Sequence, residues 1–154
     1  MQTKLGSALM QSGEREEGVA HLQTAVQLDP ASTDASYALA TSLATLNRLP
    51  EAIQACEATA AADPNYAEAH NNLSLFLAMG GRVDEALWHL RTAIRLRPDF
   101  AQAHDNLAGI LLLTGRPQEA AEQFQIVLRL QPESDEARQG LKQARAAIGG
   151  PAPR

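Results

Sequence analysis

Apolar and polar residues alternate along this chain with the period of an α-helix, in paired segments that recur every 34 residues. In one segment Leu73 and Leu77 lie four residues apart, and in the next Ala86, Leu90 and Ala93 follow at intervals of four and three. This spacing places apolar side chains on one face of a helix. The pattern predicts helices over 3–12 and 15–28, 33–46 and 49–62, 67–80 and 83–96, 101–114 and 117–130, and a last helix over 134–148.

Several series of equivalent positions carry the 34-residue period. They are Pro30, Pro64, Pro98 and Pro132; Gly13, Asn47, Gly81 and Gly115; Leu5, Leu39, Leu73 and Leu107; Leu9, Leu43, Leu77 and Leu111; and the small residues Gly18, Ala52, Ala86 and Ala120. The Gly/Asn series suits a turn with positive φ after each first helix. The prolines close each second helix, because proline cannot continue it. The leucines are expected in the core, and such hairpins must stack to bury them.

The repeating positions resemble the signature of the tetratricopeptide repeat, W-x₂-L-G-x₂-Y…A-x₃-F…P. The third period offers His70, Leu73, Ser74, Leu77, Ala86, Leu90 and Pro98, and the fourth offers His104, Leu107, Ala108, Leu111, Ala120, Phe124 and Pro132. The tryptophan of the signature is absent, and leucine replaces its tyrosine. The resemblance implies an all-α fold, a right-handed α-solenoid of helix-turn-helix repeats with a C-terminal capping helix.

This resemblance also implies the domain organisation. We expect a single domain over 1–148, with repeats over about 1–32, 33–66, 67–100 and 101–134, the capping helix over 134–148, and a disordered tail over 149–154. By this register the first repeat would begin before Met1, which favours a fragment of a longer protein.

Charge and hydropathy narrow the classes of partner. The net charge is −5, and no basic stripe is present, so nucleic acid is not expected as a partner. The excess of acidic residues before Ala67 is typical of a solvated acidic face, although it would also suit a basic partner. No run of about 18 apolar residues exists, so no membrane insertion is expected. The start of the chain lacks the features of a signal peptide, which favours a cytoplasmic location.

Residues able to carry chemistry are few and scattered. Cys56 occupies a slot that leucine or phenylalanine fills in other repeats, and His70 and His104 occupy the tryptophan slot. These positions favour packing roles. No nucleophile–base pair or phosphate-binding loop can be recognised, so we expect no enzyme activity, no cofactor and no metal site. Trp88 is expected on the convex side, either under a neighbouring loop or in a contact with a partner.

The resemblance implies that the first helices line a concave groove that binds a peptide. The groove residues expected from the register are Tyr37, Thr41, Asn71, Asn72, Leu75, Met79, Asp105, Asn106, Leu112 and Leu113. Leu112, Leu113 and Met79 suggest an apolar pocket. The "AHNNL" form is similar to repeats of O-linked N-acetylglucosamine transferases, whose asparagine ladder implies backbone recognition by Asn72 and Asn106, although these residues could equally bond an adjacent helix.

Three functions remain open at this point. The first is a protein–protein interaction scaffold with a peptide or partner segment in the groove. The second is a substrate-presenting arm of a larger enzyme such as a glycosyltransferase. The third is a self-assembly module, a homo-oligomer formed through the ends of the repeat array.

Overall fold

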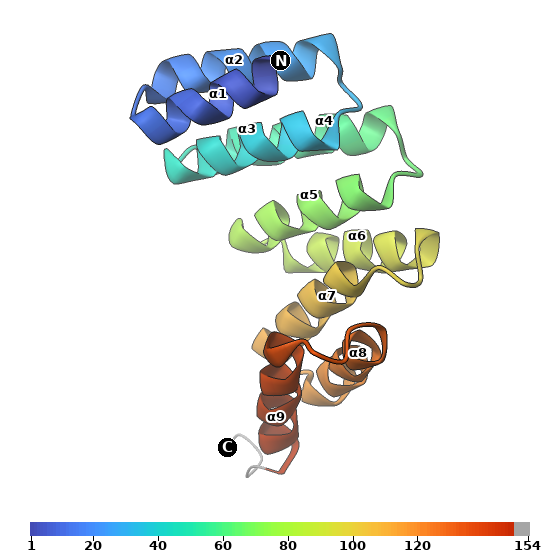
Figure 1. The fold of residues 1–154 in the computed structure, drawn as a ribbon. Coiled ribbons are helices and arrows are strands. Elements are labelled where there is room, and N and C mark those ends of the chain that lie inside the picture. Colours follow the sequence, from blue (N-terminus) through green and yellow to red (C-terminus); the bar gives the residue numbers. More distant parts are fainter. Residues whose placement is uncertain (150–154) are drawn as a thin grey trace.

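Four helical hairpins follow one another along the chain and stack side by side (Figure 1). The computed structural model describes residues 1–149. Its helices are α1 (Gln2–Ser12), α2 (Arg15–Leu28), α3 (Thr33–Thr45), α4 (Leu49–Ala62), α5 (Ala67–Met79), α6 (Val83–Leu96), α7 (Ala101–Leu113), α8 (Pro117–Leu130) and α9 (Asp135–Gly149). The all-α prediction is confirmed, and each helix begins and ends within one residue of its expected bounds. Gly149 ends α9 and does not begin a tail, while the rest of the expected tail, 150–154, lies outside the described residues.

The turn within each hairpin has the conformation that the sequence predicts. Gly13, Asn47, Gly81 and Gly115 have φ of 94°, 62°, 77° and 74°. This left-handed region is accessible to glycine and, less readily, to asparagine. Each second helix then ends at a residue with extended φ and ψ before a proline, as at Asp63 before Pro64.

Buried leucine and alanine hold neighbouring hairpins together. Leu39, Leu73 and Leu107 are buried, as are Leu43, Leu77 and Leu111 of the second series. Ala52, Ala86 and Ala120 are fully buried, so the two helices of a hairpin approach closely. The core therefore runs continuously from hairpin to hairpin.

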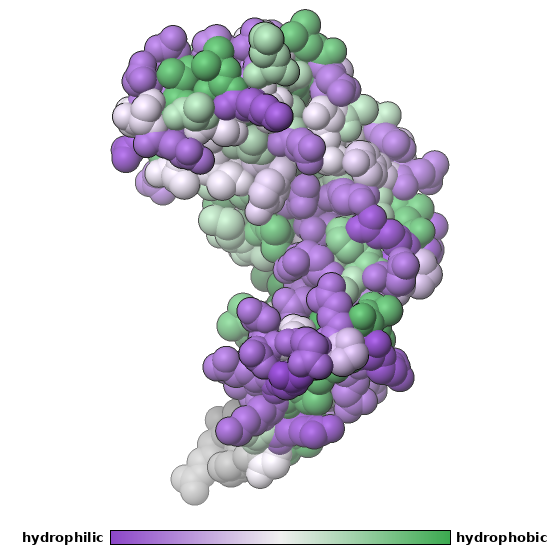
Figure 2. Space-filling model, viewed as in Figure 1, coloured by the Kyte–Doolittle hydropathy of each residue, from purple (hydrophilic) through white to green (hydrophobic). Residues whose placement is uncertain are grey.

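The first repeat departs from this pattern. Leu5, expected in the core, is 45% exposed, and Leu9 is only half buried. The later leucines of these series lie in first helices that pack against the second helix of the preceding hairpin, as α3 packs against α2. In the described structure no helix covers α1 on that side, so the prediction for Leu5 was wrong. Figure 2 shows hydrophobic residues gathered at this end of the molecule, over α1 and α2.

At the other end α9 packs on α8 and α7. Ala137, Gly140 and Ala144 form its buried face. Most of its other residues are polar and exposed, including Glu136, Arg138 and Lys142 in the two turns that follow its start. This arrangement covers the apolar face of α8, as the capping helix of a repeat array does.

Candidate functional site

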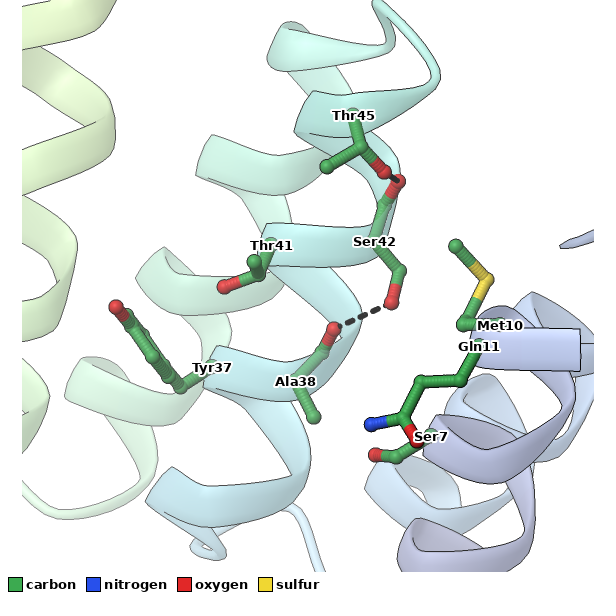
Figure 3. A pocket seen from close by; sticks show the side chains of 8 residues that line it. All are labelled: Ser7, Met10, Gln11, Tyr37, Ala38, Thr41, Ser42 and Thr45. Atoms are coloured by element: carbon green, nitrogen blue, oxygen red, sulfur yellow. Dashed lines mark hydrogen bonds between the residues drawn. The ribbon is translucent and has the colours of Figure 1, made fainter. Parts of the chain in front are cut away.

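Two adjoining hollows lie between α1, α3 and α5, which are the first helices of the first three hairpins. The hollow between α1 and α3 has a volume of about 370 Å³ and is lined by Ser7, Met10, Gln11, Tyr37, Ala38, Thr41, Ser42 and Thr45 (Figure 3). The hollow between α3 and α5 has a volume of about 440 Å³ and is lined by Tyr37, Thr41, Ala44, Thr45, Leu75, Phe76 and Met79. None of these lining residues carries a charged side chain. We call the two hollows together the apolar groove.

The predicted residues Tyr37, Thr41, Leu75 and Met79 meet in the apolar groove because of helical spacing. Tyr37 and Thr41 lie one turn apart on α3, and Leu75 and Met79 lie one turn apart on α5. The Tyr37 side chain points toward α5, where its ring lies 6.0 Å from that of Phe76. Tyr37 is 41% exposed and Met79 is 63% exposed. The groove therefore presents apolar surface that remains open to a ligand.

Two hydroxyl groups of the groove, those of Ser42 and Thr45, are turned toward the backbone of α3. Ser42 Oγ donates to the carbonyl oxygen of Ala38 at 2.8 Å, and Thr45 Oγ1 donates to that of Ser42 at 2.7 Å (Figure 3). With their protons used within α3, these side chains add little donor capacity to the hollow. The ring of Phe76, which the sequence analysis did not single out, closes the floor and is 4% exposed. The sequence signal that could have identified Phe76 was its place on α5 between Leu75, which was expected in the groove, and Leu77, which was expected in the core.

The asparagines form a chain of side-chain amides between α5 and α7. Asn106 Nδ2 donates to Asn71 Oδ1 at 2.8 Å, and Asn71 Nδ2 donates to Asn72 Oδ1 at 3.3 Å. Gln102 Nε2 donates to Asn106 Oδ1 at 3.3 Å. Asn71 is buried, so the expectation that it faces the groove was wrong. Asn72 and Asn106 remain partly exposed, and whether they also bind a ligand stays a prediction.

The remaining expected groove residues lie apart from the apolar groove. Asp105 lines a separate hollow of about 310 Å³ between α7, α8 and α9, together with Ala101, Gln102, Val127, Gln131, Ser134 and Glu136. Burial and then the charge of Glu136 raise the pKa of Asp105. Leu112 packs against the core, and Leu113 is almost fully exposed. Neither leucine lines the hollow that contains Met79, so the structure does not bring together the three residues of the expected pocket, Leu112, Leu113 and Met79, in that hollow.

The structure also shows the surroundings of Cys56, of the potential metal ligands and of Trp88. Burial raises the pKa of the Cys56 thiol to about 11, which keeps it protonated near neutral pH. Within residues 1–149 no three His, Cys, Asp or Glu side chains converge as metal ligands. Trp88 is 59% exposed on α6 and packs edge-on against His89, with ring centroids 4.8 Å apart. It is therefore not covered by a loop.

Comparison with known proteins agrees with this architecture. The tetratricopeptide repeat family matches residues 3–67 and 80–135, more than half of the chain. The chain belongs to the tetratricopeptide repeat family. No curated protein matches it in sequence. None of the helices in the described part of the chain is long and apolar enough to cross a bilayer.

Three solved structures illustrate the similarity. A crystal structure of the MamA protein is 20% identical with a TM-score of 0.79, covering 96% of this chain and 81% of that one. The pilF protein of Pseudomonas aeruginosa is 27% identical with a TM-score of 0.77, covering 99% of this chain and 76% of that one. A thermophilic tetratricopeptide repeat protein of Thermus thermophilus is 23% identical with a TM-score of 0.74, covering 96% of this chain and 81% of that one.

Proposed function

We propose that this chain is a protein-interaction scaffold that holds a peptide segment of its partner in the apolar groove. Proteins of the tetratricopeptide repeat family generally mediate protein–protein interactions. The observation that carries the proposal is the pair of adjoining uncharged hollows over α1, α3 and α5, rimmed by the exposed side chains of Tyr37 and Met79.

The chemistry of the groove suits apolar side chains of a partner. Aromatic residues are enriched among those that dominate binding energy at interfaces, and methionine adapts its shape to different apolar ligands. A side chain entering the hollow between α3 and α5 would cover Tyr37, Leu75 and Met79 without desolvating any charge. Removal of this apolar surface from water would drive association.

Selection from a displayed random peptide library, followed by rebinding of the selected peptides to variants, tests the proposal. Met79→Gln keeps the length of the side chain and places an amide in the hollow, so we expect it to weaken the selected peptides. Leu28→Gln is the matched control, because Leu28 is 74% exposed on α2 and lines neither hollow of the groove. Peptides that bind parent and Met79→Gln equally would refute recognition in the groove.

A second candidate function, self-assembly, is favoured by the uncovered face of α1. Met1, Leu5 and Ala8 are exposed, whereas the equivalent Ala35, Leu39 and Ser42 of α3, which packs on the preceding hairpin, are buried. A second copy that packed on this face would bury the stripe. Sedimentation equilibrium of the parent and of Leu5→Gln distinguishes the possibilities: a dimer that Leu5→Gln dissociates supports self-assembly, and a monomeric parent at high concentration contradicts it.

A further inference from the structure

The surface beyond the apolar groove changes character along the first helices. The uncharged hollow between α3 and α5 is followed by the amide chain of Asn71, Asn72 and Asn106 between α5 and α7. Next comes the hollow at the start of α7 and α9 that contains Asp105 and Glu136, which we call the acidic hollow. Apolar, amide and acidic surfaces thus occur in order on consecutive first helices.

Asp105 and Glu136 have no cationic partner among residues 1–149. Neither carboxylate takes part in an ion pair, and the lining of the acidic hollow includes no Lys, Arg or His. Glu136 accepts only a long hydrogen bond of 3.4 Å from the Ser134 hydroxyl. The nearby Arg138 pairs instead with Asp135 and Glu133. Burial, and then the charge of Glu136, raise the pKa of Asp105.

Among the residues at positions equivalent to Glu136, Glu68 is neutralised by an ion pair, whereas Asp34 of α3 is a carboxylate that takes part in no ion pair with the described residues. Glu68, 34 residues before Gln102, is paired with Arg97, whose guanidinium also lies 3.5 Å from the centre of the Phe100 ring. The position equivalent to Glu68 is neutral in the fourth repeat, as Gln102, and acidic again in α9, as Glu136. The acidic hollow is therefore where a ligand cation would meet two carboxylates without a resident competitor.

We propose that the partner segment is an extended, positively charged peptide, with an apolar side chain in the hollow between α3 and α5 and a lysine or arginine in the acidic hollow. This inference rests on the proposed function, because it assumes that the groove binds a peptide. It identifies the class of peptide by charge complementarity with Asp105 and Glu136.

The geometry of the array sets the spacing of the two contacts. Neighbouring packed helices are separated by about 10 Å, so two steps along the first helices span about 20 Å. An extended chain covers about 3.3 Å per residue, which places the apolar side chain and the cation about six residues apart. The amide nitrogen of Asn72 on α5 donates no hydrogen bond within the described residues, and its side chain lies beside Thr33 and Ser36 of α3.

Fluorescence anisotropy with three short labelled peptides tests this inference. The first peptide carries a Leu–Phe pair and a Lys–Arg pair about six residues apart. The second carries Glu–Asp in place of Lys–Arg, and the third keeps the basic pair immediately next to the apolar pair. We expect the first peptide to bind most tightly, with an affinity that falls as salt rises.

Matched variants separate a specific contact from general attraction to an acidic protein. The double variant Asp105→Asn with Glu136→Gln should weaken the first peptide about tenfold or more, as expected for loss of charge-assisted hydrogen bonds. Asp84→Asn with Glu122→Gln changes the net charge equally, at exposed positions of the second helices α6 and α8, and should leave the affinity unchanged. Thermal unfolding of both variants verifies that they remain folded.

The outcomes distinguish this inference from the proposed function. Equal binding of the basic and acidic peptides, both weakened by Met79→Gln, would overturn the charge inference and leave groove binding intact. Binding of the basic peptide that Met79→Gln does not change would contradict the proposed function itself. Equal weakening by the two double variants, or no binding of the basic peptide, would also overturn the inference.

Discussion

At the scale of single residues, polar pairs replace the tryptophan that the family signature places on each first helix. The partner lies 19 residues later, on the second helix of the same hairpin. The distances are 2.6 Å between Gln2 Oε1 and His21 Nδ1, 2.8 Å between Nδ1 of His70 and Nδ1 of His89, and 2.7 Å between His104 Nδ1 and Gln123 Oε1. Hydrogen bonds therefore join the two helices within each of these hairpins, at the position where the signature uses aromatic packing.

Two of these histidines also hold the loop that precedes their helix. Nε2 of His70 and Nε2 of His104 each lie 3.0 Å from a proline carbonyl oxygen, that of Pro64 and Pro98 respectively. Because Nε2 of His70 donates to a carbonyl, Nδ1 of its neutral ring is left as an acceptor. In the third repeat His89 must then donate from its own Nδ1 to His70.

This proton arrangement makes the His70–His89 pair sensitive to acid. Burial, and then the charge of His70, lower the pKa of His89 to about 4, while Glu85 and Glu57 oppose the shift and Arg82 adds to it. In the unfolded chain histidine titrates near pH 6.5. Between pH 6.5 and 4 the unfolded state therefore binds a proton at His89 that the folded state does not, so stability falls as the pH falls through this range.

We expect His89→Gln to reduce this pH dependence. The substitution reproduces the His–Gln pair that the fourth repeat already contains at His104 and Gln123. It keeps a partner for His70 Nδ1 and removes the titrating ring, so urea unfolding between pH 6.5 and 4 should show a shallower loss of stability than in the parent. Equal slopes for variant and parent would show that other groups cause the acid sensitivity.

The amide chain predicts different effects for its two partly exposed asparagines. Asn106→Ala would leave Asn71 Oδ1, on a side chain that is 4% exposed, without its partner, and should cost about 1–3 kcal/mol of stability. Asn72→Ala removes only the acceptor of a longer bond and should cost less. Urea denaturation of both variants measures the difference. Equal effects would mean that the bond between Asn106 and Asn71 adds little.

At the scale of helices, the seating of α9 depends on the absence of a side chain at Gly140. A Cβ atom at this position would lie 2.3 Å from Cζ of Phe124 on α8. We expect Gly140→Ala to destabilise the protein by about 1–3 kcal/mol, because the ring must move in a packed core. The measurement is thermal or urea unfolding, with hydrogen exchange of α9 as a local readout.

Gly109 supplies the matched control for Gly140→Ala. It also lies within a helix, α7, but a Cβ atom there would have no neighbour within 4 Å. Gly109→Ala should stabilise the protein by about 0.5–1 kcal/mol through the helix preference of alanine alone. If the two substitutions had the same sign, the contact between Gly140 and Phe124 would not control the seating of α9.

Helices and turns could be predicted from the sequence because their signals are local. The 3.6-residue spacing, the positive φ at Gly13 and Asn47 and the prolines after each second helix depend on a few neighbouring residues. The exposure of Leu5 could not be predicted in this way, since it depends on whether another helix covers α1. The burial of Asn71 also depends on its partner Asn106, 35 residues away on another helix.

The candidate binding surface was predicted only in part for the same reason. Tyr37, Thr41, Leu75 and Met79 follow from the register, because equivalent faces of first helices point the same way. The acidic hollow brings together Asp105 and Glu136 from α7 and α9. Their meeting depends on how α9 packs against the last hairpin, which the repeat pattern alone does not specify.

At the scale of the whole molecule, equivalent leucines should differ in energy according to their place in the stack. Leu107 is buried between α7 and the preceding hairpin, whereas Leu5 is 45% exposed at the end of the array. Leu107→Ala should cost about 2–5 kcal/mol, and Leu5→Ala much less, because only the first leaves a cavity. Equilibrium unfolding tests this. Equal losses would contradict the described stacking order.

The proposed function requires that the partner bind in the apolar groove, and the location of a bound peptide tests this most directly. We would titrate isotopically labelled protein with a peptide selected from the displayed library and follow the backbone amide resonances. We expect the largest shifts on Tyr37, Thr41, Leu75 and Met79, and no change in the surroundings of Trp88. Shifts centred on Trp88 or on the exposed face of α1, with α3 and α5 unaffected, would contradict the proposed function.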